Sequence, residues 1–138
     1  MSAVVIDASV AVAWCFEDEA SPEADRILDR VRVHGARVPA LWYLEVANVL
    51  RQAERRKRIS PAGTAARLEL LSHLPITADA SSATRAWSEI LDVARSQTLT
   101  VYDAAYVELA MRLALPIASR DREVNSAAER LGIAVLVT

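Results

Sequence analysis

The stretch VVIDASVAVAWCF, residues 4–16, is apolar almost throughout and carries a single carboxylate, Asp7, near its middle. Its beginning, AVVI (3–6), is short, β-branched and apolar on both alternations, which predicts a strand buried on both faces. Residues 8–16 are expected to form a helix that begins directly after Asp7. An ionised group removed from water costs several kcal/mol unless it gains a partner. Asp7 therefore either caps this helix or belongs to a site that needs negative charge.

The alternation of strands and helices continues along the rest of the chain. Two helices are expected to open on Ser-Pro pairs, where serine caps the helix and proline takes its first position. No hairpin signal separates the apolar runs, so a parallel sheet covered by helices is favoured. There is no repeat and no linker, and we expect residues 1–138 to form a single domain. The predicted helices are 21–31, 41–57, 60–75, 81–97, 102–115 and 121–132, and the further strands are 37–38, 76–77, 116–119 and 133–137.

The composition is that of an ordinary soluble globular protein: 53 % of the 138 residues are hydrophobic and 25 % are charged. A net charge of −2 gives no attraction between the whole molecule and nucleic acid, so such a partner needs a local basic patch. The single cysteine, Cys15, excludes an internal disulfide and a multi-cysteine zinc site. No secretory signal and no apolar run of about 20 residues is present, so we expect a cytoplasmic protein without a membrane segment.

Four acidic residues stand at or near the beginnings of predicted helices. Asp7 and Asp121 each follow a predicted strand, Glu45 lies in the first turns of helix 41–57, and Asp103 opens helix 102–115. Ligands bind outside the carboxyl ends of parallel strands, so these acids could share one edge of the sheet. The alternative is that each one caps a helix or favours its dipole, and Thr100 with Asp103 resembles a capping box. Against that alternative, Asp7 and Glu45 have bulky apolar neighbours, which do not suit a solvent-facing acid.

If the four acids converge, their repulsion decides the chemistry. Two unit charges ~6 Å apart repel by about 2.8 kcal/mol at an effective dielectric of ~20. Six such pairs cost on the order of 15 kcal/mol, which exceeds the stability of most domains. The cluster must therefore take up protons or bind a cation, and oxygen ligands select Mg²⁺ or Mn²⁺. The sequence has no phosphate-binding glycine loop and no histidine in a triad arrangement, so metal-activated water attacking a phosphodiester fits best.

The chain resembles the PIN-domain ribonucleases, and in particular the VapC-type toxins of toxin–antitoxin pairs. The resemblance rests on four ordered motifs, which are VVIDASV (4–10), LEVANVL (44–50), TVYDAAYVELA (100–110) and IASRDREV (117–124). It implies a three-layer α/β/α sandwich with a mainly parallel sheet. It also implies a Mg²⁺- or Mn²⁺-dependent endoribonuclease that is the toxin of such a pair.

The resemblance also assigns roles to residues. Asp7 and Asp103 would hold the metal directly or through water, while Glu45 and Asp121 would complete its shell and help position the attacking water. Arg120 and Arg122 flank Asp121, and their charge could neutralise this carboxylate instead of leaving it for a metal. The supporting residues would be Ser9, Asn48 and Ser119, the last of which keeps a hydroxyl where the family often has threonine.

Partners follow from the same resemblance, which implies an RNA substrate, a homodimer and an antitoxin segment that occupies the acidic groove. The most basic segment, RQAERRKR (51–58), could contact the RNA backbone or an acidic stretch of a partner. It could equally be a solvated helix end, where cations favour the dipole. Its cations are Arg51, Arg55, Arg56, Lys57 and Arg58.

Two rival functions stay open at the level of sequence. The first is a processing nuclease of the same fold, acting on RNA or DNA outside a toxin pair. The second is a non-catalytic, acidic, Mg²⁺-binding module for signalling or binding. A signalling module of that kind would place a lysine near the site from a late strand, and the late strands here contain none.

Overall fold

The computed structural model describes residues 1–138 and contains one sheet of five strands in the order β3-β2-β1-β4-β5. Every neighbouring pair of strands is parallel, as the sequence predicts. β1 occupies the centre, and all three of its residues are buried. The strands are β1 (Val4–Ile6), β2 (Ala36–Val38), β3 (Ile76–Ala78), β4 (Ile117–Ala118) and β5 (Val135–Leu136).

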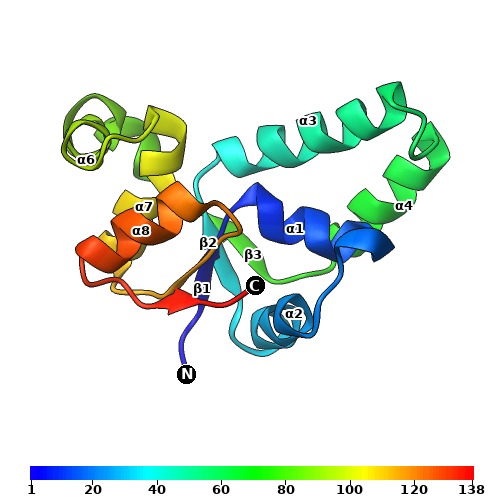
Figure 1. Ribbon diagram of the computed structural model, residues 1–138, viewed down its shortest axis with the longest axis horizontal. Coiled ribbons are helices and arrows are strands. Elements are labelled where there is room, and N and C mark those ends of the chain that lie inside the picture. The colour runs from blue at the N-terminus through cyan, green and yellow to red at the C-terminus, as the bar shows by residue number, and fades with distance from the viewer.

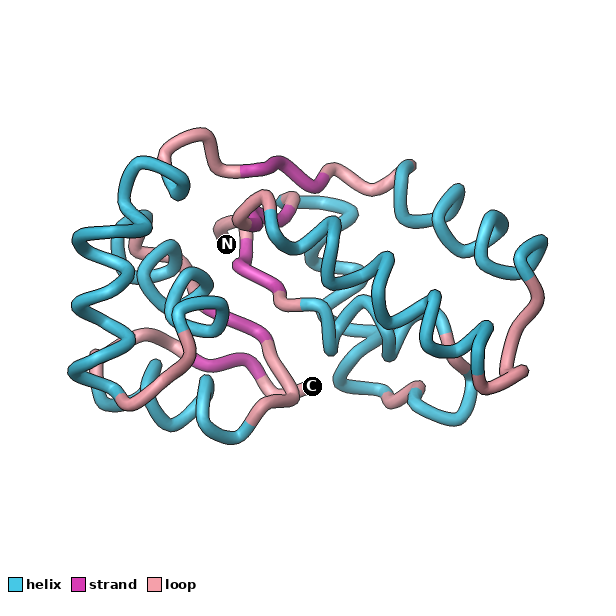
Figure 2. Tube along the Cα trace, turned by 90° about the horizontal axis from the view of Figure 1, so that it is seen from above, coloured by secondary structure: helices cyan, strands magenta, loops and turns pink.

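Helices cover both faces of the sheet and make a three-layer α/β/α arrangement (Figures 1 and 2). The first four helices lie on one side of the sheet and the later ones on the other, which confirms the predicted fold class. No helix is both long enough and apolar enough to span a bilayer. The helices are α1 (Ala8–Cys15), α2 (Pro22–His34), α3 (Leu41–Arg55), α4 (Pro61–Ser72), α5 (Ser82–Arg85), α6 (Leu91–Gln97), α7 (Val101–Leu113) and α8 (Arg122–Arg130), with a 3₁₀ turn η1 (Glu17–Glu19) and a π turn η2 (Ala86–Ile90).

The path of the chain reverses beside the central strand. From β1 the chain moves outward to β2 and then to β3, and it later returns to the other side of β1 to form β4 and β5. The loops after β1 and β4 therefore open side by side at the carboxyl edge of the sheet. In open parallel sheets this switch point is the usual place for a ligand.

Side-chain caps set the beginnings of three helices as the sequence predicts. Ser21 Oγ accepts a hydrogen bond from the backbone N–H of Ala24 at 3.0 Å, and Ser60 Oγ accepts one from Gly63 at 3.1 Å. A proline follows each of these serines at the first helical position. Thr100 Oγ1 caps α7 by accepting from the N–H of Asp103 at 3.1 Å.

α7 is the central helix of the molecule. Its residues 104–110 are all buried, and it packs against β1, β4, α6 and α8. Such a helix has no freedom to shift without disturbing the core, because interiors are close-packed. Asp103, in its first turn, is therefore held in a fixed place at the carboxyl edge of the sheet.

The prediction of a single regular helix over 81–97 is wrong in one respect. The π turn η2 interrupts it, and the extra residue in that turn rotates the positions that follow. Ile90, Val93 and Ala94 are buried, whereas Trp87, which the helical pattern places on the buried face, is 94 % exposed. A period of 3.6 residues cannot describe a segment that contains a wider turn.

Gly35 is the position at which the fold depends most directly on a glycine. Its φ is +82° with ψ 172°, a conformation that is essentially restricted to glycine, and an added Cβ would lie 3.1 Å from the carbonyl oxygen of Pro75. We expect Gly35→Ala to lower the free energy of unfolding by about 1–3 kcal/mol in urea denaturation. Gly132→Ala is the matched control, because its φ is also positive but no atom lies within 4 Å of the added Cβ. An equal loss in both variants would show that the contact with Pro75 is irrelevant.

Candidate active site

Asp7 lies at the end of β1, where it is buried and bound by two serines from different parts of the chain. Its Oδ1 accepts from the backbone N–H of Ser9 at 3.1 Å, which caps α1, and from Ser9 Oγ at 2.5 Å. Its Oδ2 accepts from the hydroxyl of Ser119, on the loop after β4. Burial raises the pKa of Asp7 above its ordinary value, although these hydrogen bonds oppose the rise. Asp7 thus caps α1, as one of the two alternatives predicts, and it also accepts a long-range hydrogen bond from Ser119 that a cap does not require.

The loop after β4 is ordered around Ser119. Ser119 Oγ accepts from the N–H of Asp121 at 2.9 Å, and the Ser119 carbonyl accepts from Asn125 Nδ2 at 2.9 Å. The Oγ of Ser9 accepts from the N–H of Arg120 at 2.9 Å, so the loops after β1 and β4 are joined twice. The hydroxyl at position 119 thus has two partners: it donates to Asp7, and it accepts from the backbone N–H of Asp121 and so orients that residue.

Asp121 caps α8 with one of its two oxygens. Oδ1 accepts from the N–H groups of Glu123 and Val124 at 2.8 and 3.2 Å, and Oδ2 accepts no hydrogen bond from the protein. Neither flanking arginine forms an ion pair with it. The Arg120 guanidinium instead donates to Ser21 Oγ at 3.2 Å. Asp121 therefore keeps one free oxygen at the edge of the sheet.

Asp103 and Glu45 complete the group from the two sides of the sheet. Burial raises the pKa of Asp103, and the negative charges of Asp121 and Asp7 raise it further. Burial likewise raises the pKa of Glu45, and the charges of Asp103 and Asp7 add to this, against a hydrogen bond from Tyr106 that lowers it. These mutual effects place the four acids in one electrostatic neighbourhood at the switch point. The carboxylates do not, however, form a ready-made cage: no three acidic, histidine or cysteine side chains are gathered closely enough to hold an ion as they stand.

A model of the PIN-domain family matches residues 4–130, which is nearly the whole chain. The chain belongs to the PIN-domain family. PIN domains are typically nucleases and typically bind divalent metal ions. No protein with a curated description matches the sequence.

Solved structures share this fold over almost their full length. PAE2754 from Pyrobaculum aerophilum is 24 % identical with a TM-score of 0.71, and the alignment covers 98 % of this chain and 91 % of that one. FitAcB from Neisseria gonorrhoeae is 16 % identical with a TM-score of 0.64, covering 96 % of each chain. FitAB bound to the IR36 DNA fragment is 15 % identical with a TM-score of 0.58, covering 97 % and 94 %. At these identities the likeness concerns the fold.

The donor atoms of this PIN domain suit a hard divalent cation. The edge of the sheet offers carboxylate oxygens and no sulfur or imidazole, which is the ligand chemistry of Mg²⁺ and Mn²⁺. A cation would also favour the ionised forms of Asp7, Glu45 and Asp103, whose pKa values burial raises, and would relieve the repulsion that raises those of Glu45 and Asp103 further. The chemistry of the donors therefore fits the divalent metals that the family typically binds.

The other residues singled out from the sequence, Asn48 and the basic run 51–58, form no hydrogen bond or ion pair with the four acids. Asn48 is exposed on α3, where its side chain makes no hydrogen bond and lies three residues after Glu45, on the same side of the helix. In the basic run, Arg58 pairs with Asp18 at 3.0 Å and lies over the ring of Phe16, while Arg51 contacts Glu54 at 3.3 Å. The remaining cations, Arg55, Arg56 and Lys57, have no ion pair.

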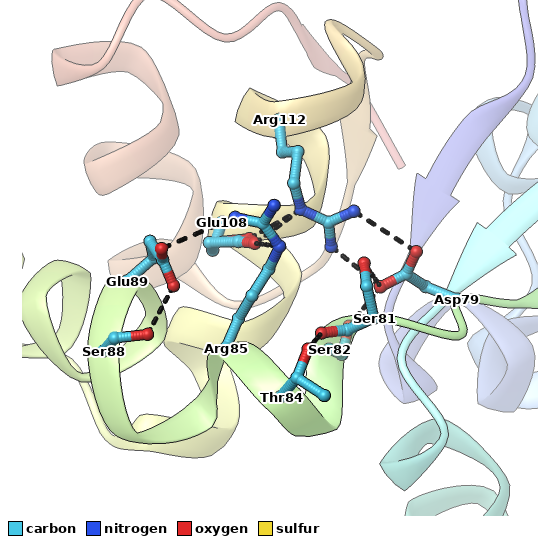
Figure 3. Close-up of polar contacts among 9 residues, drawn as sticks. All are labelled: Asp79, Ser81, Ser82, Thr84, Arg85, Ser88, Glu89, Glu108 and Arg112. Carbon is cyan, nitrogen blue, oxygen red and sulfur yellow. Dashed lines mark hydrogen bonds and ion pairs between the residues drawn. The ribbon is translucent and has the colours of Figure 1, made fainter.

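Sequence reasoning missed two polar features of α7. The buried hydroxyl of Tyr106 donates to Glu45 Oε1, and the signal for it was its position three residues after Asp103, on the same helical face. The second feature is a buried network in which Arg112 joins Asp79, after β3, to Glu108 (Figure 3). The spacing of Glu108 and Arg112 predicts their contact, but nothing in the sequence identifies Asp79 as the third member.

Proposed function

We propose that this PIN domain is a Mg²⁺- or Mn²⁺-dependent endoribonuclease and the toxin of a VapC-type toxin–antitoxin pair. The observation that supports it best is the group at the switch point: burial raises the pKa of Asp7, and burial together with neighbouring negative charge raises the pKa values of the half-buried Glu45 and Asp103. Such a group is costly in the absence of a cation, and the family to which the chain belongs typically binds one.

The proposed roles follow from how each acid is held. Asp7, fixed by Ser9 and Ser119, and Asp103, fixed by the buried helix α7, would hold the ion. Glu45 and Asp121, each with an oxygen free of protein hydrogen bonds, would accept hydrogen bonds from the attacking water and orient it. A bound divalent ion supplies an activated water and stabilises charge on the phosphate.

The test is cleavage of one labelled single-stranded sequence, made as RNA and as DNA, by purified protein. We expect the RNA to be cut with Mg²⁺ or Mn²⁺ and left intact with EDTA, because the acids need a cation to act. An Asp103→Asn variant purified in parallel controls for contaminating ribonuclease. Failure of the wild type to cut either strand despite binding Mn²⁺ would contradict a catalytic role.

A second candidate is a nuclease acting on DNA, and the structure of FitAB with a DNA fragment is the observation that raises it. The same assay separates the two, because preferential cutting of the DNA strand would replace RNA by DNA as the substrate. The toxin assignment has its own readout: induced expression should arrest growth, and a small protein encoded beside the gene should relieve the arrest. We also propose a cytoplasmic homodimer, to be checked by light scattering.

A further inference from the structure

One hydrogen bond links Glu45 to the core of the molecule. The Tyr106 hydroxyl, on a residue 1 % exposed, donates to Glu45 Oε1, and Glu45 accepts no other hydrogen bond from the protein. The two residues are 61 positions apart and belong to helices on opposite faces of the sheet, α7 and α3. This bond therefore joins two layers of the fold at the acidic group.

α7 is the rigid side of that link. It is buried along most of its length, and Tyr106 follows Asp103 by three residues, so both side chains project from the same face. A single helix thus supplies one acid of the group and the donor that holds another. The separation between Asp103 and Glu45 is set by this helix as long as the hydrogen bond exists.

α3 is the less constrained side. It packs mainly on α1 and α4 and extends away from α7 beyond its first turns (Figure 1). A glutamate side chain on such a helix has several rotamers, and ordering it costs free energy that a partner must offset. The negative charges of Asp103 and Asp7 disfavour ionised Glu45 at this place, and the hydrogen bond from Tyr106 opposes them.

We propose that Tyr106 is a positioning residue, which holds Glu45 at the metal-binding edge through Oε1 and leaves Oε2 for the ion or its water. The inference rests on the proposed function, because that function gives Glu45 a role beside the metal ion. Tyr106 touches neither ion nor substrate and acts only through Glu45. The competing explanation is that Glu45 merely satisfies a buried hydroxyl and stabilises the fold.

The experiment is a Mn²⁺ titration of the free protein by calorimetry, with Tyr106→Phe as the variant. Phenylalanine keeps the ring and removes only the donor. We expect Mn²⁺ to bind about 10–100-fold more weakly, as is typical when a partner of a metal ligand is lost. Tyr102→Phe is the matched control on the same helix, because its hydroxyl is exposed and makes no hydrogen bond, and its affinity should equal that of the wild type.

A double-mutant cycle with Glu45→Ala separates positioning from simple stabilisation. If Tyr106 acts through Glu45, Tyr106→Phe should have no further effect on Mn²⁺ affinity once Glu45 is alanine. An equal loss in both backgrounds, or wild-type affinity in Tyr106→Phe alone, would overturn the inference. Absence of Mn²⁺ binding in the wild type would instead contradict the proposed function, so the two failures are distinguishable.

Discussion

Asp103→Asn is expected to reduce cleavage at least about 100-fold while leaving the metal-free protein as stable as the wild type or more stable. The carboxylate is partly buried beside Asp121 and Asp7, whose charges repel it. The helix does not depend on it, since Thr100 supplies the cap of α7. Removing this charge therefore takes away a metal ligand and a source of repulsion in one step. Cleavage and thermal unfolding in EDTA are the two measurements.

The pH dependence of the metal-free protein gives a second measure of the cost of keeping these acids ionised, to which burial contributes most and repulsion adds. The folded pKa values of Asp7, Glu45 and Asp103 are raised, so their contribution to stability is fully present below their ordinary values near 4 and is lost as pH rises through the folded values. The melting temperature in EDTA should therefore rise as pH falls from 7 towards 5. Asp103→Asn should flatten this rise, and Mn²⁺ should remove it.

Asp7→Asn is the informative comparison with Asp103→Asn, because Asp7 also caps α1. An asparagine keeps one carbonyl oxygen for the N–H of Ser9, and the hydroxyl of Ser119 can reorient towards the new amide. We expect its metal-free stability to be unchanged or raised as well. A clear loss of stability in both asparagine variants would mean that these acids stabilise local structure, and it would contradict the proposal that they hold a metal ion.

The order of elements was predictable because it depends on local chemistry. Buried parallel strands are short apolar runs in the sequence. The Ser21-Pro22 and Ser60-Pro61 pairs predict the beginnings of two helices, and the structure confirms both. The position of Asp7 and of Asp121 directly after a strand also follows from these signals, whereas the pairing of those two strands, β1 and β4, does not. The sequence could not settle whether these acids cap helices or form a site. The structure shows that both Asp7 and Asp121 cap helices, and their role in a metal site stays a proposal.

The contacts that the sequence did not reveal are long-range or depend on irregular backbone. In the sequence Tyr106 is one more residue of an apolar helix, and only the structure shows that it donates to Glu45 on α3. Asp79 is likewise an ordinary loop acid in the sequence, and only the structure shows that it accepts from Arg112. The exposure of Trp87 depends on a π turn that no regular period encodes. The partners of Tyr106 and Asp79 come from packing between segments, which a pattern within one segment does not specify, and the π turn is a local irregularity that breaks the helical period.

Arg112→Met should be the most destabilising single change among these predictions, lowering the free energy of unfolding by about 3–5 kcal/mol at pH 7. The guanidinium contacts both oxygens of Asp79, at 2.8 and 3.3 Å, and its Nε lies 2.7 Å from Glu108 (Figure 3). The side chains of Asp79 and Glu108 are only 6 % and 2 % exposed. Methionine fills a similar volume, so the expected loss comes mainly from leaving buried Asp79 without a cation, since Glu108 keeps Arg85 at 4.0 Å.

Urea denaturation at two pH values identifies that cause. Hydrogen bonds from Arg112 hold the pKa of Asp79 well below its usual range, so its stabilising effect is present above pH 4 and is lost as pH falls further. The cost of Arg112→Met should therefore shrink near pH 3, and it should also shrink at pH 7 in the double variant with Asp79→Asn. Arg95→Met is the matched control, because Arg95 and Asp92 are both more than 70 % exposed and the change should stay within about 0.5 kcal/mol. A cost that is the same at both pH values would point to lost packing between α7 and the loop after β3, with charge playing no part.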